Sequence, residues 1–338
     1  MKKREGVRLG VVGASGLVGQ TLLQAITEMN LRFVEIRCFG YRSSGERILF
    51  QNDFLTIQPL CPNCFDGLDF VIFSAGKQVS LEYAAIAVDY NCIVIDNSSA
   101  FRLRPEIPLI VPEINFDEIK DAKLIANPNC ATIQLVLVLN AIKKIASIRR
   151  VDVVSLQSVT GAGRSALEQF RLEVVGQDVM RRVLKHQIRD NLIPQIGDFD
   201  SSGYSEEENK IIFETKKILK MDNLQVSATC VRVPTIGGHS QAVRLEFDDE
   251  VDLLRIREAL VSSPSVVFMD TNRTGEYPMP ILTAGKNEVF VGRLRADKVS
   301  SKICHIWIVA DNLRKGAAVN ALQILLKLTE KFGLQILN

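Results

Sequence analysis

Four glycines recur at every third position near the start of the chain, at residues 10, 13, 16 and 19. They span the end of an apolar run (7–12) and the start of an apolar-periodic segment (17–29). Glycines at a strand-to-helix turn permit a tight bend, let backbone N–H groups approach a phosphate and let the helix pack closely on the strand. We therefore predict a dinucleotide-binding turn.

Three further apolar runs, 33–39, 69–73 and 92–96, continue the pattern of a parallel, doubly wound sheet. The carboxyl ends of such strands gather at one edge, where ligands bind. The first of these runs is followed by Arg42 and Ser43, not by the acidic residue that usually binds the ribose of NAD. An arginine flanked by hydroxyls suits the 2′-phosphate of NADP, whereas an ordinary surface arginine is the alternative. We predict NADP as the cofactor.

Length and composition limit the rest of the molecule. A chain of 338 residues exceeds one compact core, so two domains are expected. The net charge of +2 gives no electrostatic footprint for a nucleic acid or a membrane surface. No apolar run reaches the length of a membrane span, and no signal-peptide core follows Met1. We expect a cytoplasmic protein without nucleic-acid or membrane partners, with its seven cysteines as reduced thiols.

Cys130 follows an Asn-Pro-Asn turn and precedes a long apolar run, 133–142, which ends at two lysines. Asparagine and proline are helix start signals and late lysines are a stop signal, so Cys130 is expected in a first helical turn. Unpaired backbone N–H groups and the helix dipole favour a negative charge there, which lowers the pKa of a thiol and makes it a nucleophile. The alternative is a small buried hydrophobe, the usual role of a free cysteine.

From about residue 150 the pattern changes to strand-like runs separated by long segments of helical character. The runs are 151–157, 226–232, 241–247 and 305–310. This pattern predicts an α+β domain with an antiparallel component. The segment 316–332 is typical of an amphipathic helix that could return to cover the first domain. We predict a Rossmann-type domain over 1–131, completed by 313–338, and a second domain over 132–312.

Polar side chains stand out in this second half. Gln157 ends a strand, Arg232 precedes Pro234, and His239 lies in a glycine-rich loop. A histidine there is a candidate functional group, with a merely exposed side chain as the alternative. Of the other two histidines, we expect His186 on a solvated helix face and His305 as packing within an apolar strand.

One CxxC pair, Cys61-Pro-Asn-Cys64, is present. Structural zinc sites use a second pair or a histidine couple at matching spacing, and the sequence near this pair has neither. We predict no metal or redox site there.

Seven motifs together resemble those of the aspartate-semialdehyde dehydrogenases, in the order of that family and over nearly the whole chain. They are Gly13-Ala-Ser-Gly16-Leu-Val-Gly19, Phe73-Ser-Ala-Gly76, Asp96-Asn-Ser-Ser99, Pro128-Asn-Cys-Ala-Thr-Ile-Gln134, Ala228-Thr-Cys-Val-Arg-Val-Pro234, His239-Ser240 and Asp311-Asn-Leu-Arg-Lys-Gly-Ala-Ala318. The resemblance implies a Rossmann-type domain joined to a catalytic and dimerisation domain, a homodimer, and no metal. It also implies NADP-dependent interconversion of L-aspartyl phosphate and L-aspartate 4-semialdehyde, with phosphate as co-substrate, on the route to lysine, diaminopimelate, methionine and threonine.

The resemblance also assigns roles to individual residues. Cys130 matches the nucleophile that forms an acyl thioester, His239 the general acid/base, and Gln157 the residue that orients the substrate. Arg232 resembles the arginine that binds the substrate carboxylate, and Glu207 falls where a carboxylate lies near the substrate amine, between two other glutamates. The remaining matches are Asn129 for substrate, Arg102 and Lys210 for phosphate, and Gly13, Ala14, Ser15, Gly16, Arg42, Ser43, Thr160, Gly161 and Asn312 for cofactor.

The chain departs from the family pattern at Ala131, at Lys77, at 236–238, and over the less recognisable segment 164–203. Three other interpretations stay open. N-acetyl-γ-glutamyl-phosphate reductase shares the fold and chemistry, although its substrate has no free amine for Glu207 to bind. A cysteine hydrolase would have no use for the glycine turn and Arg42. A non-catalytic dinucleotide-binding paralogue would need none of the four polar residues Cys130, Gln157, Arg232 and His239.

Overall fold

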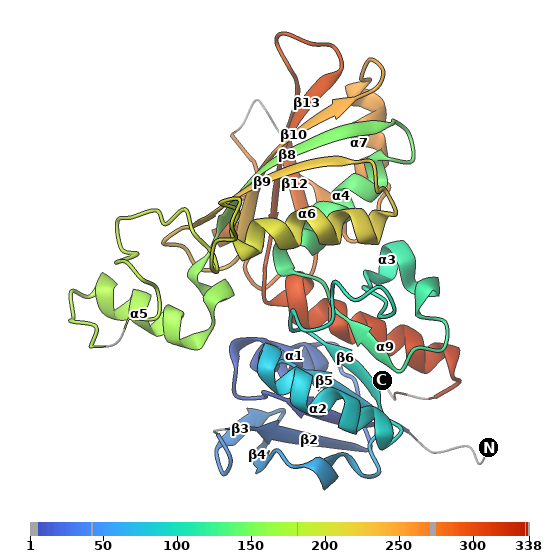
Figure 1. Cartoon of the computed structure of the whole chain (residues 1–338), viewed down its shortest axis with the longest axis vertical. Helices are drawn as coiled ribbons and strands as arrows, with labels where there is room; N and C mark the ends of the chain where they lie inside the picture. The colour runs from blue at the N-terminus through green and yellow to red at the C-terminus, as the bar shows by residue number, and fades with distance from the viewer. Residues whose placement is uncertain (1–5, 42, 181, 271–274, 335, 337–338) are drawn as a thin grey trace. The chain divides into compact units, whose positions relative to one another are not determined.

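The computed structural model describes residues 6–41, 43–180, 182–270, 275–334 and 336. The chain divides into two compact units, one formed by Met1–Asn129 with Ala317–Asn338 and the other by Cys130–Gly316. We call them the first and second units (Figure 1). The functional domain boundaries that the sequence suggested, 131/132 and 312/313, stay a prediction.

The first unit is built on a seven-stranded sheet in the order β3-β4-β2-β1-β5-β6-β7, in which every pair is parallel except β3–β4. Its strands are β1 (Arg8–Val12), β2 (Glu35–Gly40), β3 (Arg47–Phe50), β4 (Asp53–Pro59), β5 (Phe70–Phe73), β6 (Ile93–Asp96) and β7 (Leu124–Ala126). β5 is buried along its whole length, as expected for a strand with both faces covered. The doubly wound α/β fold predicted for this part of the chain is confirmed.

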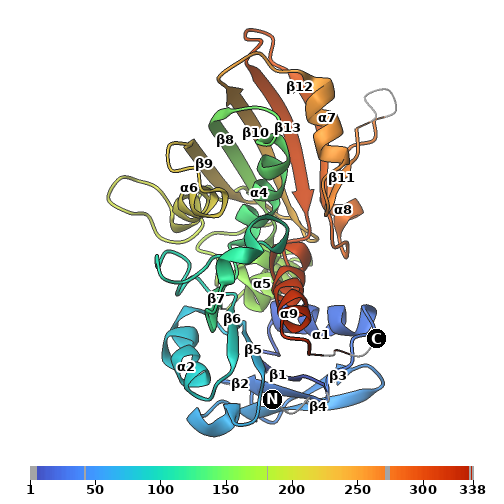
Figure 2. The ribbon, with the colours of Figure 1, turned by 90° about the vertical axis from the view of Figure 1, so that its right-hand side faces the viewer.

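Helices complete the first unit. They are α1 (Leu17–Glu28), α2 (Lys77–Asp89), the short α3 (Pro112–Asn115) and α9 (Val319–Lys331), with 3-10 turns η1 (Pro62–Phe65) and η2 (Phe116–Ile119). The predicted C-terminal helix is confirmed as α9, which follows a π-helical turn η4 (Arg314–Ala318). It packs beside α1 (Figure 2) and buries Leu322, Leu325 and Leu328 in one cluster with Leu9 and Val11 of β1. The end of the chain therefore completes the core that its start begins.

The second unit contains a six-stranded sheet in the order β11-β12-β13-β10-β8-β9. Its strands are β8 (Ile148–Gln157), β9 (Gln225–Arg232), β10 (His239–Phe247), β11 (Val266–Phe268), β12 (Val289–Ala296) and β13 (Ile303–Ala310). The pairs β8–β9 and β11–β12 are parallel and the other three are antiparallel. The predicted α+β domain with an antiparallel component is confirmed. The helical elements of this unit are α4 (Cys130–Ile142), η3 (Val159–Ala162), α5 (Arg164–Val174), α6 (Glu206–Leu219), α7 (Leu253–Val261) and α8 (Pro280–Thr283).

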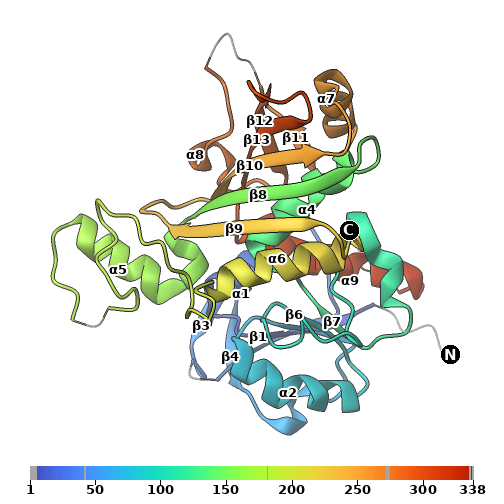
Figure 3. The ribbon, with the colours of Figure 1, turned by 45° about the horizontal axis from the view of Figure 1, so that its top comes forward.

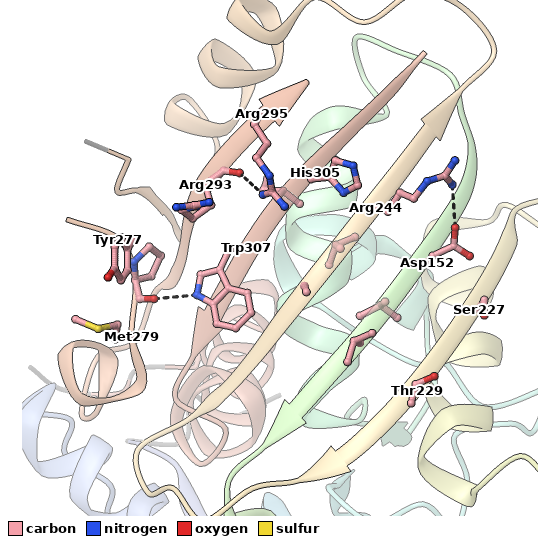
Figure 4. Close-up of a pocket in the computed structure, with 16 residues that line it drawn as sticks. Asp152, Ser227, Thr229, Arg244, Tyr277, Met279, Arg293, Arg295, His305 and Trp307 are labelled. Carbon is pink, nitrogen blue, oxygen red and sulfur yellow. Dashed lines mark hydrogen bonds and ion pairs between the residues drawn. The ribbon is translucent and has the colours of Figure 1, made fainter. Parts of the chain in front are cut away.

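The two faces of this sheet differ. α4 packs against β8 and β13, α6 runs beside β9 (Figure 3), and α7 packs against β11 and β12. Side chains on this covered face, such as Val153, Leu245 and Ile308, are almost fully buried. Their neighbours along each strand point to the opposite face because side chains alternate in a strand. That open face carries Asp152, Val154, Ser227, Thr229, Ala242, Arg244, Arg293, Arg295, His305 and Trp307, which line a hollow of about 630 Å³ in front of the sheet (Figure 4).

Side chains of α5 organise the loop that follows it. The amide oxygen of Gln169 accepts hydrogen bonds from the backbone N–H groups of Val183 and Leu184, at 2.8 and 2.9 Å. One carboxylate oxygen of Glu173 accepts from two more N–H groups, at residues 188 and 189. His186 is exposed in this loop and is not on a helix, so the expected helix was wrong. The basic run around His186 does not form a helix, because backbone N–H groups of this loop donate instead to the Gln169 and Glu173 side chains of α5.

No helix in the described part of the chain combines the length and apolar character needed to cross a bilayer.

Candidate active site

Cys130 is the first residue of α4, as the turn and stop signals predicted. Eleven of the twelve residues after it in α4, all but Asn140, are buried, so packing fixes the direction of the helix. The Cys130 Sγ lies 3.3 Å from the Nε2 of His239, although the two residues are 109 positions apart in sequence. A thiol at the start of a helix, next to an imidazole, has the environment of a nucleophile.

His239 is the first residue of β10 and is completely buried. The glycine-rich loop is present but ends at Gly238, and the alternative of an exposed histidine was wrong. Gly237 and Gly238 have φ of 95° and 143°, and a Cβ on Gly238 would lie 2.5 Å from the carbonyl oxygen of Ala310. The glycines therefore allow the chain to approach β13 closely before β10 begins.

The surroundings of the His239 ring favour its neutral form. The backbone N–H of Ser158 donates a hydrogen bond to Nδ1 at 3.1 Å. Burial lowers the pKa of His239 to about 3, and the Arg232 cation acts in the same sense. The Glu207 carboxylate and the Gly238 backbone act in the opposite sense but are outweighed.

Arg232 and Gln157 are register partners on the parallel strands β9 and β8, and both are buried. The Arg232 Nη1 donates to the carbonyl oxygen of Ser158 at 2.8 Å. A Cβ on Gly161 would lie 2.9 Å from that Nη1 and 3.1 Å from the His239 Nε2. The structure therefore brings His239 and Arg232 together beside Gly161 of η3, where a Cβ would force their side chains to shift.

Three consecutive glutamates at the start of α6 have different surroundings. Glu208 accepts from the backbone N–H of Ser205 at 2.7 Å and that of Cys230 at 2.9 Å, which makes it part of a capping box. Glu206 is largely exposed, whereas Glu207 is buried with its carboxylate 3.2 Å from the Lys210 Nζ. Geometry thus singles out Glu207 and pairs it with Lys210. The S-x-x-E spacing from Ser205 to Glu208 is the sequence signal for this cap.

Arg102 is buried in the first unit, where it donates to the carbonyl oxygens of Asn127 (2.9 Å) and Asn97 (2.6 Å). Asn127 also donates to the Asn97 side chain at 2.8 Å and accepts from Asn320 at 2.7 Å. Asn129 is buried as well. This network, which the sequence did not reveal, fixes the Asn-Pro-Asn turn from the side of the first unit.

The glycine turn has the form that a dinucleotide phosphate requires. Gly13 has φ of 85°, and a Cβ there would lie 2.7 Å from the Ser74 carbonyl. α1 begins after Gly16 with no side-chain cap, so its first N–H groups can bind an anion. Ala14 is fully buried under the turn, and the Ser15 hydroxyl donates to the Ser43 hydroxyl at 2.9 Å. Arg42 lies outside the described residues.

The other predicted cofactor residues lie in the second unit. The Thr160 hydroxyl donates to the Asn312 side-chain oxygen at 2.9 Å, and the Ser158 hydroxyl donates to the same atom at 3.1 Å. Thr160 and Asn312 therefore form one cluster next to Gly161. Their role toward a cofactor stays a prediction.

Two further sequence expectations concern groups outside this cluster. His305 was expected to be packing, but it is partly exposed on the open face with its Nε2 2.8 Å from the Asp297 carboxylate. That expectation was wrong because alternation along β13 directs residue 305 away from the helices. Cys61 and Cys64 are free thiols, and no group of three or more His, Cys, Asp or Glu side chains within the described ranges is arranged to hold a metal ion.

Comparisons with known proteins agree with the fold. Residues 8–122 match the family model for "Semialdehyde dehydrogenase, NAD binding domain", and residues 139–315 match "Semialdehyde dehydrogenase, dimerisation domain". The aspartate-semialdehyde dehydrogenase of Aquifex aeolicus is 43% identical, over 94% of this chain and 97% of that protein. The enzyme of the same name from Campylobacter jejuni is 39% identical, over 98% of this chain and 99% of that one.

Among solved structures, the crystal structure of aspartate semialdehyde dehydrogenase II complexed with ASA from Vibrio cholerae is similar over both units. It has a TM-score of 0.91 and 33% sequence identity, covering 97% of this chain and 100% of that one.

Proposed function

The chain belongs to the aspartate-semialdehyde dehydrogenase family, and from that premise we propose the complete reaction. It is the NADP-dependent reductive dephosphorylation of L-aspartyl 4-phosphate to L-aspartate 4-semialdehyde, and the phosphate-dependent reverse, in the cytoplasm. The proposal is carried by one observation, the Cys130 thiol at the start of α4 within 3.3 Å of the His239 imidazole. An aldehyde–acyl phosphate couple needs a soft nucleophile that can hold the acyl group as a thioester.

Cys130 attacks the acyl carbon of aspartyl phosphate, the C–S bond forms, and phosphate leaves. His239 serves the oxygen on that carbon as the acid/base group. A bound nicotinamide would supply the hydride that converts the thioester to the aldehyde. Gln157, buried at the end of β8, orients the acyl group, and Asn129 adds a further substrate contact.

The substrate has anionic groups at both ends and an amine at one, which calls for separate binding groups. Arg232 binds the carboxylate, since the planar guanidinium of arginine matches it bidentately. Glu207 binds the amine. Arg102 and Lys210 bind the phosphate. A glutamyl homologue without a free amine leaves the buried Glu207 carboxylate without a substrate contact, which favours the aspartyl substrate.

Gly13, Ala14, Ser15 and Gly16 would bind a phosphate of the cofactor at the start of α1, and Thr160, Gly161 and Asn312 are the further cofactor contacts that we propose. Arg42 and Ser43 would bind the 2′-phosphate of NADP. The direct test of the reaction measures NADP reduction with aspartate semialdehyde, with and without phosphate. Phosphate-independent turnover, or a preference for NAD, would contradict the proposal.

Arg42→Glu tests the cofactor choice separately. It replaces a cation with a repelling carboxylate, so NADP affinity should fall by about 1.5–3 kcal/mol while NAD affinity changes little. An unchanged NADP/NAD preference would mean that another group binds the 2′-phosphate.

We also propose that a second copy packs on the open face of the six-stranded sheet to form a homodimer. The dimerisation-domain model spans that sheet. The hollow there combines apolar groups with charged ones, and Val154, Tyr277 and Met279 are each more than a third exposed. Exposed patches of this kind on a sheet mark association surfaces.

A further inference from the structure

The His239 ring is held at both nitrogens. On one side Nδ1 accepts a hydrogen bond from the Ser158 backbone N–H at 3.1 Å, and on the other Nε2 lies 3.3 Å from the Cys130 Sγ. A neutral imidazole has one N–H and one lone pair. Because a backbone amide can only donate, the lone pair of His239 is at Nδ1 and its proton at Nε2, directed at the sulfur.

The charges around the ring oppose a second proton. Arg232 on β9 is close to the ring. A Cβ on Gly161 would lie 2.9 Å from the Arg232 Nη1 and 3.1 Å from the His239 Nε2. The Glu207 carboxylate on α6 attracts a cation, but Lys210 lies 3.2 Å from it. An imidazolium would also direct a new Nδ1–H at the Ser158 N–H and lose that hydrogen bond.

Two other groups face the site. The Gly238 backbone, next to the ring, favours the charged form of His239 but is outweighed by burial and Arg232. The Cys230 thiol on β9 is buried, and burial raises its pKa far above the usual value, so it adds no charge. The charges of Arg232 and Cys130 interact, which makes Arg232 the candidate counter-charge for a Cys130 thiolate.

We propose that His239 remains neutral with its proton on Nε2, positioned by the Ser158 amide, and that Arg232 instead of an imidazolium balances the Cys130 thiolate. This rests on the proposed function and narrows the acid/base role of His239 to hydrogen-bond donation. His239 does not take the thiol proton, because the nitrogen that faces the sulfur already carries one.

Acyl transfer then balances without a change at His239. The thiol proton passes to solvent when the thiolate forms. The thiolate attacks the acyl carbon, and the Nε2–H donates to the carbonyl oxygen as that oxygen gains charge. The C–O bond to phosphate breaks, phosphate leaves with the electron pair, and the proton that phosphate takes up at neutral pH comes from solvent.

The tautomer can be observed directly. Nitrogen NMR of the ¹⁵N-histidine-labelled enzyme, without substrate, should show His239 with a bare Nδ1 and a protonated Nε2 from pH 6 to 9. His239→Gln identifies its signals among those of the three histidines. Ser158→Ala is the matched control, since it removes the hydroxyl but keeps the amide, and the tautomer should persist. An imidazolium, or a proton on Nδ1, would overturn the proposal.

Titration of the thiolate tests the role of Arg232. The difference in ultraviolet absorbance between the native enzyme and Cys130→Ser isolates the Cys130 thiolate from the other six cysteines. The same absorbance difference, with and without Cys130→Ser, is then measured for each variant of Arg232 and His239. In Arg232→Leu the midpoint should rise by about one pH unit or more, and Arg232→Lys should largely restore it. In His239→Gln the titration midpoint should move by less than it does in Arg232→Leu.

A larger rise in His239→Gln than in Arg232→Leu would establish an imidazolium–thiolate pair and refute our inference. Both experiments use enzyme without substrate. Their failure is therefore separate from failure of the proposed function, which would appear as absent turnover of aspartate semialdehyde by the native enzyme.

Discussion

The covered and open faces of the six-stranded sheet each carry one histidine, and the two are held in opposite ways. On the covered side, His239 is fully buried, bonded to a backbone amide, and its pKa is lowered to about 3. On the open side, His305 is partly exposed, and its hydrogen bond is the main reason that the pKa of Asp297 is lowered to about 2. A shift of one residue along a strand decides the face. The face, more than the residue type, therefore decides whether a histidine is a neutral donor or the partner of a carboxylate.

The largest effect is expected where the covered face meets the start of α4. Cys130→Ala should reduce turnover by ~10⁴-fold or more, because the covalent path is lost, while fold and NADP binding remain. Iodoacetamide should label Cys130 before Cys38 and Cys304, since burial raises the pKa of those two thiols to about 12. Equal labelling rates would argue against a thiolate at the helix start.

The two anion-binding sets should fail differently. Arg232→Leu should reduce kcat/KM by ~10- to 150-fold, since a charge-assisted pair contributes about 1.5–3 kcal/mol, and should also suppress thioester formation from the semialdehyde. Lys210→Ala should mainly raise the KM for phosphate. A burst of NADPH without added phosphate reports the first half-reaction. If Lys210→Ala loses the burst and Arg232→Leu keeps it, the two assignments are reversed.

Variants of the open face should change assembly before they change chemistry. Trp307→Glu places a charge where the second copy is proposed to pack, and should weaken the dimer by about 3 kcal/mol, roughly 100-fold in Kd. Leu254→Glu introduces the same charge at a position 70% exposed on α7 and is the matched control. Sedimentation velocity distinguishes them, and an unchanged mass for Trp307→Glu would place the interface elsewhere.

The smallest effect concerns pH and the His305–Asp297 pair. The folded pKa of Asp297, about 2, lies below its ordinary 3.8. The carboxylate therefore adds stability that is present above pH 3.8 and is lost as the pH falls through about 2. Asp297→Asn should slightly lower the Tm at pH 6, by an amount that shrinks as the pH approaches 2. A Tm difference that does not change with pH would show that the ion pair contributes nothing.

Much of the fold followed from local patterns, and the exceptions have physical reasons. β1, β5 and β6 were predicted because strands covered on both faces give continuous apolar runs, and β2 because Ile36 and Cys38 alternate with Glu35 and Arg37. β4 was missed since most of its side chains are exposed, and β7 since it has three residues. In each case the sheet neighbours define the strand more than its own composition does.

The functional residues also differ in how far the sequence alone predicted them. Helix signals alone placed Cys130 at the start of α4. His239 was a candidate from its glycine-rich surroundings, but its role beside Cys130 came only through the family resemblance, because a contact between residues 109 positions apart leaves no periodic trace. The glycines before His239 suggested an exposed loop, when their function is to let the backbone pass close to β13. The burial that lowers the pKa of His239 exists only in the assembled unit and could not be predicted from sequence.

The hollow on the open face has a consequence for inhibition. Its volume of about 630 Å³ is within the range of sites that hold small organic ligands. If the second copy packs there as proposed, a compound that filled the hollow would compete with that copy and not with the substrate or the cofactor. Its potency would then fall as enzyme concentration rises and would not depend on substrate concentration.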